Sequence, residues 1–310
     1  MKPRNFIRVE DFTKKEYEEM FEMGKSFLEG KDLSRAAAGK VLASLFFQES
    51  TRTSNVFKSA MIALGGGVIG IDGVEGTYLA KGEEDKEDFI AAFSQLSDLM
   101  VLRDSDPKTL EAAVHVSKIP VINGGIGTEE HAAAGLARGL RDYCRFDGID
   151  GMKICLYGAP GPSRSAKAFI KFYSLFNTEI YEDIVMPELG LPEEIYQFVK
   201  KQGKTIKKVK LEDVIDKIDF LLVEGIPTKF VDKNLVEKYL SLFKPITMEE
   251  VSKMKKNAIF QPISPRIIQG NLFSVTKETD SDSRSGLADF VKYWKIATMA
   301  LIVKLLNLKA

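Results

Sequence analysis

The order of apolar and polar stretches along this 310-residue chain predicts alternating strands and helices. The apolar run at 41–47 is typical of a strand buried in a parallel sheet. Apolar positions over 56–64 recur at helical spacing and end at three consecutive glycines, 65–67, which favours a helix that stops there. The same rhythm predicts further strands at 68–71, 99–103 and 121–123, and helices at 88–96, 108–116 and 129–146. This alternation is typical of a parallel sheet covered by helices.

A second round of strands and helices begins after the polar, glycine-rich break at 148–151. Strands are expected at 153–157, 220–223 and 258–260. The chain is also longer than an average single domain. The fold class predicted is therefore α/β, with two doubly wound parallel-sheet domains over residues 1–140 and 141–287. Residues 288–310 are apolar at helical spacing, and we expect a C-terminal helix that packs back on the first domain.

The composition excludes several classes of protein. Forty-four basic residues balance forty-four acidic ones, which argues against a nucleic-acid or membrane-surface partner. Cys144 and Cys155 are too few for a disulfide framework, and their apolar neighbours favour buried thiols over a metal site. No apolar run approaches the roughly 20 residues of a membrane span, and the first residues lack a signal-peptide core. We therefore expect a cytoplasmic protein.

The turn after the first predicted strand has the features of an anion site. It joins a buried strand to a helix start, where unpaired N–H groups and the positive end of the helix dipole attract negative charge. Ser50, Thr51 and Thr53 add neutral donors. Arg52 adds a fork-shaped cation that suits phosphate oxygens. A serine or threonine helix cap beside an exposed arginine has the same local pattern, so the turn alone leaves both interpretations open.

Polar residues also follow several other predicted strands. In open parallel sheets, ligands bind beyond the carboxyl ends of the strands. Arg103 ends the third strand, Asn123 the fourth, and Arg164 follows the first strand of the second domain. His131, just after the fourth strand, has an imidazole suited to donating to a substrate carbonyl oxygen. Each has a plain structural alternative when taken singly, but their shared placement favours one site.

Several of these segments resemble the aspartate and ornithine carbamoyltransferases. Residues 46–53 closely resemble the family's Ser-Thr-Arg-Thr carbamoyl-phosphate motif. Residues 77–83 resemble the loop whose lysine, here Lys81, reaches the neighbouring subunit's active site. Residues 101–103 resemble the strand that bears a carbonyl-contacting arginine, and 123–131 resemble the approach to the family's His-Pro-x-Gln motif. The aspartate branch is the more similar one, because the lysine loop fits it better.

The resemblance implies a reaction, roles for the site residues and an assembly. The reaction is transfer of the carbamoyl group of carbamoyl phosphate to the amine of aspartate or a related amino acid, as in pyrimidine biosynthesis, without a metal or organic cofactor. The turn at 50–53, with Lys81 of an adjacent chain, would hold the phosphate, and Arg103, Thr53 and His131 would contact the carbonyl oxygen. A lysine that serves a neighbouring site implies a homotrimer closed by cyclic symmetry. Whether a regulatory chain also binds is left open.

The chain departs from the family pattern in both domains. After His131 the family has Pro-x-Gln, whereas this chain has three alanines at 132–134, so the glutamine that contacts the carbamoyl amide is absent. The family's Arg-x-Ser-Phe-Glu after the phosphate motif is replaced by residues 54–58. The first-domain anion site is nevertheless largely retained.

The expected acceptor site in the second domain is more strongly altered. Arg164 matches the arginine that binds the acceptor's carboxylate, but Gly225 replaces a later arginine. In place of the family's His-Pro-Leu-Pro-Arg motif, this chain has Gln-Pro-Ile-Ser-Pro-Arg at 261–266, which is one residue longer. Lys229 and Arg266 lie near these changes and are candidates to substitute for the lost contacts.

Three functional hypotheses follow. The leading one is a carbamoyltransferase of the aspartate type. The second is a non-catalytic relative that keeps the anion pocket and acts as a subunit or sensor, motivated by the alanines at 132–134 and by Gly225. The third is another phosphate-binding enzyme on the same scaffold. Turnover with carbamoyl phosphate and a panel of amines separates them.

Overall fold

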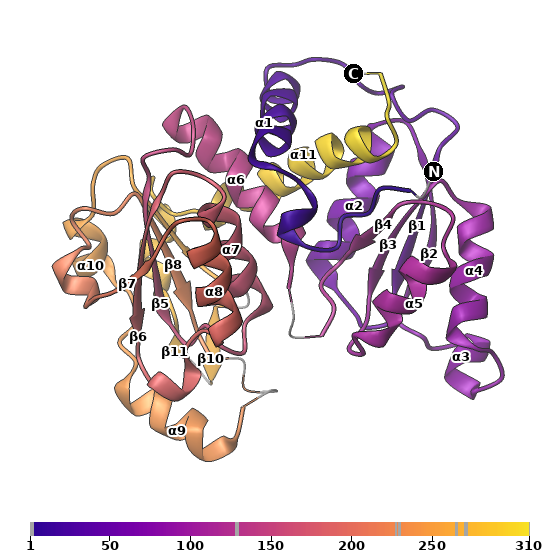
Figure 1. Cartoon of the computed structure of the whole chain (residues 1–310). Coiled ribbons are helices and arrows are strands. Elements are labelled where there is room, and N and C mark those ends of the chain that lie inside the picture. The colour runs from indigo at the N-terminus through magenta and orange to yellow at the C-terminus, as the bar shows by residue number, and fades with distance from the viewer. Residues whose placement is uncertain are drawn as a thin grey trace. The chain divides into compact units, whose positions relative to one another are not determined.

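The computed structural model (Figure 1) describes residues 3–127, 130–226, 228, 231–263, 266–269 and 272–309. It divides into two compact units. Unit 1 comprises Met1–Asp147 and Val291–Ala310, and unit 2 comprises Gly148–Phe290. The division falls seven residues after the boundary expected at residue 140, because the helix that contains this residue continues to Phe146 and ends where Asp147 takes a left-handed conformation, with φ 55°.

The sheet of unit 1 is parallel and has the strand order β2-β1-β3-β4. Its strands are β1 (Val41–Phe46), β2 (Gly67–Asp72), β3 (Leu99–Arg103) and β4 (Val121–Asn123). The predicted strands are thus confirmed, with ends within about one residue. The chain reverses its direction of winding between β1 and β3, and the crevice at such a switch point is where ligands bind in open α/β sheets.

The helices of unit 1 are α1 (Lys14–Leu28), α2 (Thr51–Ala63), α3 (Tyr78–Lys81), α4 (Lys86–Leu96), α5 (Lys108–Val116), α6 (Ala132–Phe146) and most of α11 (Leu287–Leu305). A short 3₁₀ turn, Val9–Asp11, precedes α1. Helices α4 and α5 pack on each other, as do α1 and α6. The predicted closing helix is confirmed as α11, and its residues from Val291 onward belong to unit 1.

The sheet of unit 2 is also parallel, with the order β7-β6-β5-β8-β9. Its strands are β5 (Lys153–Gly158), β6 (Glu179–Ile184), β7 (Ile206–Lys208), β8 (Phe220–Glu224) and β9 (Ile259–Pro262). The switch point lies between β5 and β8. The predicted fold class, two parallel-sheet α/β domains, is confirmed.

The helices of unit 2 are α7 (Arg164–Ser174), α8 (Glu193–Lys201), α9 (Lys233–Leu242) and α10 (Met248–Lys253), with 3₁₀ turns at Pro187–Leu189, Leu211–Asp213 and Lys277–Ser281. Helices α7 and α8 lie side by side (Figure 1). Strands β10 (Ile267–Gln269) and β11 (Leu272–Phe273) form a small antiparallel pair. None of the helices in the described ranges has the length and apolar character needed to cross a membrane.

Gly158 fixes how the end of β5 meets β8. Its φ is +118°, a conformation that side chains disfavour, and a Cβ at this position would lie 1.9 Å from the carbonyl oxygen of Glu224. Only glycine avoids both penalties. This close approach brings the end of β8 against the turn that leads into α7.

Candidate active site

The turn between β1 and α2 leaves the start of α2 open to a ligand. Ser50 is the N-cap residue, with φ −154° and ψ 107°, but its side chain makes no capping hydrogen bond. The first turn of α2 contains no acidic residue, and Thr51 and Arg52 are exposed. The N–H groups at this helix start are therefore not neutralised by Ser50, which favours the anion-site interpretation over the simple cap.

Ser50 instead joins the turn to the end of the neighbouring strand. The Arg103 guanidinium donates through Nη1 to Ser50 Oγ at 3.2 Å. Phe46 and Arg103 are register partners on β1 and β3, and Phe47 N donates to Arg103 O at 2.9 Å. The structure thus brings together Arg103 and the anion turn at the switch point of unit 1.

A second pair of the expected site residues meets beside the first. Thr53 Oγ1 and His131 Nε2 are 3.5 Å apart, and these two residues are only 3% and 5% exposed. His131 is the N-cap residue of α6, with φ −127° and ψ 71°, and its side chain does not cap the helix. Its ring also lies edge-on to Trp294 of α11, with centroids 5.5 Å apart and an interplanar angle of 63°. Sequence reasoning missed Trp294.

Asn123 shapes the loop that carries His131. Its side-chain oxygen accepts from Gly125 N at 2.8 Å and from Ile126 N at 3.0 Å. Its amide nitrogen donates to Ile7 O at 3.0 Å and to Glu130 O at 3.1 Å. Asn123 is therefore a structural residue that ties the β4–α6 loop to the N-terminal segment, rather than a group aimed at a ligand.

A buried polar cluster that the sequence did not reveal follows Arg103 directly. Asp104, 5% exposed, accepts from Lys86 Nζ at 2.7 Å and from Thr109 Oγ1 at 2.6 Å. Burial alone would raise the pKa of this carboxyl, but the hydrogen bonds from Lys86 and Thr109 outweigh burial and lower it. Asp104 O also accepts from Gly127 N at 3.0 Å. Asp104 thus connects the loop after β3 to the loop that leads to His131.

A second polar cluster lies where the chain departs from the family's Arg-x-Ser-Phe-Glu pattern. The Asp72 carboxylate, at the end of β2, accepts hydrogen bonds from Ser54 Oγ and Lys58 Nζ of α2. Burial raises the pKa of Asp72, while these two donors together lower it further than burial raises it. The altered residues of α2 therefore have a local partner that holds this helix against the end of β2.

Lys81 stands apart from these pairs. It is exposed, ends the short helix α3, and places its Nζ over the Tyr78 ring at 5.1 Å from the centroid. Gly82 follows it with φ 70°. Within the described residues of this single chain, the Lys81 side chain makes no hydrogen bond or ion pair, so its expected contact with a phosphate stays a prediction.

In unit 2, Arg164 opens α7 just beyond the switch point between β5 and β8. Ser163 caps the helix, because its Oγ accepts from Ala166 N at 3.2 Å. Burial lowers the pKa of the Arg164 guanidinium, which remains charged at neutral pH. At the end of β8, the Glu224 carboxylate is buried and Gly225 follows it. The carboxyl ends of β5 and β8 therefore carry the guanidinium of Arg164 and the carboxylate of Glu224.

Arg266, expected as a substitute acceptor contact, is held by other groups. It forms a two-pronged ion pair with Asp280, and its guanidinium lies 5.4 Å from the centroid of the Phe273 ring. The hydrogen bonds that Arg266 donates to the Asp280 carboxylate raise the pKa of Arg266. Lys229, the other expected substitute, lies outside the described residues.

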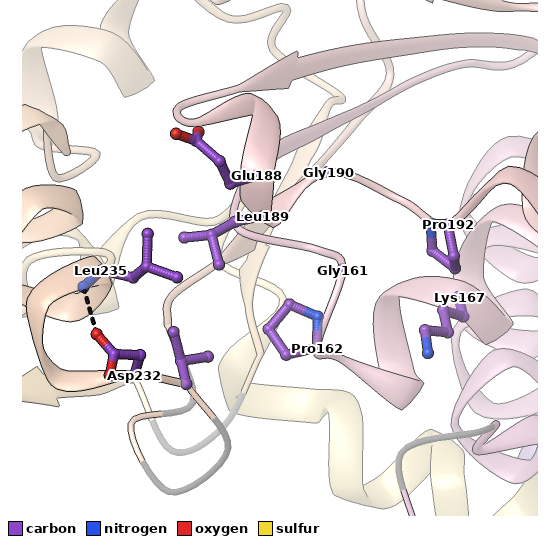
Figure 2. Close-up of a pocket in the computed structure, with 10 residues that line it drawn as sticks. Gly161, Pro162, Lys167, Glu188, Leu189, Gly190, Pro192, Asp232 and Leu235 are labelled. Carbon is purple, nitrogen blue, oxygen red and sulfur yellow. Dashed lines mark hydrogen bonds between the residues drawn. The ribbon is translucent and has the colours of Figure 1, made fainter.

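A cavity of about 340 Å³ lies within unit 2 near the start of α7 (Figure 2). Its wall includes Gly161, Pro162, Lys167, Glu188, Leu189, Gly190, Pro192, Val231, Asp232 and Leu235. Asp232 caps α9 by accepting from Asn234 N at 2.9 Å, and Glu188 pairs with Lys238 at 3.1 Å. Among the residues that the structure describes, none of the site residues expected from the sequence lines this cavity.

The chain is similar in sequence and fold to known proteins over nearly its whole length. Residues 4–138 match the family model of the aspartate/ornithine carbamoyltransferase carbamoyl-phosphate binding domain. The aspartate carbamoyltransferase catalytic subunit of Sulfurisphaera tokodaii is 30% identical over 303 residues, covering 97% of each chain. That of Finegoldia magna is 30% identical over 316 residues, covering 100% of each. The solved catalytic subunit of M. jannaschii aspartate transcarbamoylase superposes with a TM-score of 0.84 at 27% identity, over 98% of both chains.

Proposed function

Because the chain belongs to the aspartate/ornithine carbamoyltransferase family, we propose that it transfers the carbamoyl group of carbamoyl phosphate to the amine of aspartate. The observation that carries this proposal is the pairing of Arg103 with Ser50 and of His131 with Thr53 at the open start of α2. These four residues come from three separate segments, and they supply the donors that a phosphate and an adjoining carbonyl require.

Each group has a role in the proposed reaction. The N–H groups of α2, with Ser50, Thr51 and Arg52, bind the phosphate, while Arg103 and His131 donate to the carbonyl oxygen. The neutral amine attacks the carbonyl carbon, the bond from this carbon to the phosphate oxygen breaks, and its electron pair leaves with phosphate. The amine's proton passes to the phosphate oxygens. Loss of one carbonyl donor is expected to lower the rate by about 10²–10³.

The acceptor side predicts weak binding of aspartate. Arg164 remains for one carboxylate, whereas Gly225 stands where the family has a second arginine for the acceptor. Each lost charge-assisted contact is worth about 1.5–3 kcal/mol, which corresponds to roughly 10- to 150-fold in affinity. We therefore expect a high KM for aspartate.

The assembly and location also belong to this proposal. The exposure of Lys81 on α3 supports a homotrimer in which this lysine serves a neighbouring chain. A regulatory chain bound to that trimer remains an expectation from the family resemblance. The free thiols Cys144 and Cys155 support a cytoplasmic location.

The test is a phosphate-release assay with carbamoyl phosphate and a panel of amines that includes aspartate. The wild type should release phosphate only when a suitable amine is present, and Arg52→Ala should abolish the release. Arg35→Ala is the matched control, because Arg35 is an exposed arginine elsewhere in unit 1. Binding of carbamoyl phosphate without turnover for any amine would favour the non-catalytic hypothesis. No binding of carbamoyl phosphate would contradict both.

The trimer is tested separately by light scattering and subunit complementation. A mixture of Lys81→Ala and Arg52→Ala chains should recover activity at sites that combine an intact turn with an intact lysine. A monodisperse monomer would remove Lys81 from the site.

A further inference from the structure

We propose that Trp294 is a positioning residue for His131, so that the C-terminal helix α11 forms part of the carbonyl-binding site. This role rests on the proposed function for its catalytic meaning. Its structural basis is the edge-on contact of the two rings, whose centroids are 5.5 Å apart. Trp294 is the single tryptophan in the chain.

The contact with Trp294 reaches the His131 ring from outside its own helix. His131 occupies the N-cap position of α6, yet its side chain does not bond to the helix start. The χ2 torsion of histidine has two broad orientations that differ by a half turn. Only one of them directs Nε2 toward Thr53. The alanines that follow at 132–134 have only methyl side chains.

The contact with Thr53 is too long to set this orientation alone. At 3.5 Å, the Nε2···Oγ1 separation lies at the outer limit of a hydrogen bond. The indole of Trp294 limits rotation of the imidazole from a second direction. A rigid aromatic neighbour in edge-to-face contact favours one ring orientation over its half-turn alternative.

Trp294 is itself firmly placed. It is 4% exposed, and the next turns of α11 are buried in unit 1, with Ala297, Ala300 and Leu301 at most 2% exposed. An indole anchored in this way has little freedom to move when a ligand enters. The same helix that completes the core of unit 1 therefore holds the ring that donates to the carbonyl oxygen.

A double-mutant cycle tests the coupling. Trp294→Leu, which keeps apolar volume but removes the ring, should lower kcat/KM for carbamoyl phosphate about two- to tenfold. In a His131→Asn background the same change should cost less than about twofold, because the ring it positions is gone. Leu301→Ala, a matched control that removes a buried side chain from the same helix, should lower stability without changing kcat/KM. Losses from Trp294→Leu and His131→Asn that simply multiply would overturn the proposal.

A second measurement needs no turnover. The chain has only two histidines, so ¹⁵N-labelled histidine gives two sets of ring signals, and His131→Asn identifies the set of His131. In the wild type and in Leu301→Ala, this set should report one tautomer, and in Trp294→Leu it should shift or broaden as the ring samples both orientations. An unchanged set in Trp294→Leu would refute the positioning role. If the ring signals change as expected while no amine is carbamoylated, the proposed function fails and the positioning role stands.

Discussion

Asp104→Asn is the sharpest test of how the site of unit 1 is held. The Asp104 carboxylate accepts from Lys86 Nζ at 2.7 Å, from Thr109 Oγ1 at 2.6 Å and from the backbone N of Ser105 at 2.6 Å. Asparagine keeps the shape, but it loses the charge and turns one acceptor into a donor that faces other donors. Because Asp104 follows Arg103 directly, this change should also loosen the guanidinium that contacts Ser50.

The cost can be worked out from these contacts. A hydrogen bond to a charged group is worth about 1.5–3 kcal/mol. The Lys86 side chain is 39% exposed, so water screens part of its attraction to the 7% exposed carboxylate. We therefore expect Asp104→Asn to lower the free energy of unfolding of unit 1 by about 2 kcal/mol. At about 2–4 °C per kcal/mol, Tm should fall by roughly 4–8 °C.

Unfolding is followed by the fluorescence of Trp294, the only tryptophan, which lies in the same unit as Asp104. The matched control is Lys14→Met in the same unit, because Lys14 pairs with Glu18 at 3.7 Å on the surface, where the two side chains are 36% and 40% exposed. This control should lose less than about 0.5 kcal/mol. A loss below about 0.5 kcal/mol for Asp104→Asn as well would refute the reasoning.

The same variant carries a pH dependence of known sign. The pKa of Asp104 is lower in the folded protein than its ordinary value of 3.8. Its contribution to stability is therefore complete above the unfolded pKa and is lost as the pH falls through the folded pKa. The difference in unfolding free energy between wild type and Asp104→Asn should be constant near neutral pH and shrink in acid. A difference that grows on acidification would contradict the assignment.

Three further predictions concern other parts of the chain. Gly158→Ala should destabilise unit 2 by more than about 2 kcal/mol in urea unfolding, because its Cβ would meet Glu224 O at 1.9 Å with φ +118°; a near-neutral effect would contradict the close approach. Lys58→Met should cost about 0.5–1 kcal/mol by breaking the partly exposed pair with Asp72, and the loss should vanish in about 1 M salt. The fully buried Cys155, whose pKa burial raises, should react with a thiol reagent only after unfolding; labelling of the native thiol would show that it is accessible.

The sequence predicted the strands of unit 1 and the strands β5, β8 and β9 of unit 2, most of which are apolar runs between polar turns. It did not locate β6 and β7, in which charged residues interrupt the apolar ones. It also placed the turn at 50–53 between a strand and a helix start, since a strand followed by hydroxyl residues and a helix start is a local pattern. It missed α3 within the stretch expected as loop. It also missed the start of α4 at Lys86, where Asp85 caps the helix by accepting from Glu87 N at 2.7 Å.

Contacts between distant residues were beyond the sequence. Lys86 and Asp104 are 18 positions apart, and the charge of each is also typical of a solvated surface. Trp294 and His131 meet only because α11 returns to unit 1. Arg266 was expected to contact the acceptor. Its guanidinium instead pairs with Asp280, which follows β11 in the sequence, whereas Arg266 precedes β10. The residue types show which chemical groups are present, whereas the tertiary contacts determine which of these groups lie next to one another.

Direct detection of the product tests the central claim. Carbamoyl phosphate labelled with ¹³C at the carbonyl is incubated with aspartate and the protein, and the reaction is read by mass spectrometry. The proposed function predicts ¹³C-labelled N-carbamoyl-aspartate in amounts equal to the phosphate released, and none with Arg52→Ala. Phosphate release without the labelled product, at aspartate concentrations that saturate the reaction, would contradict it.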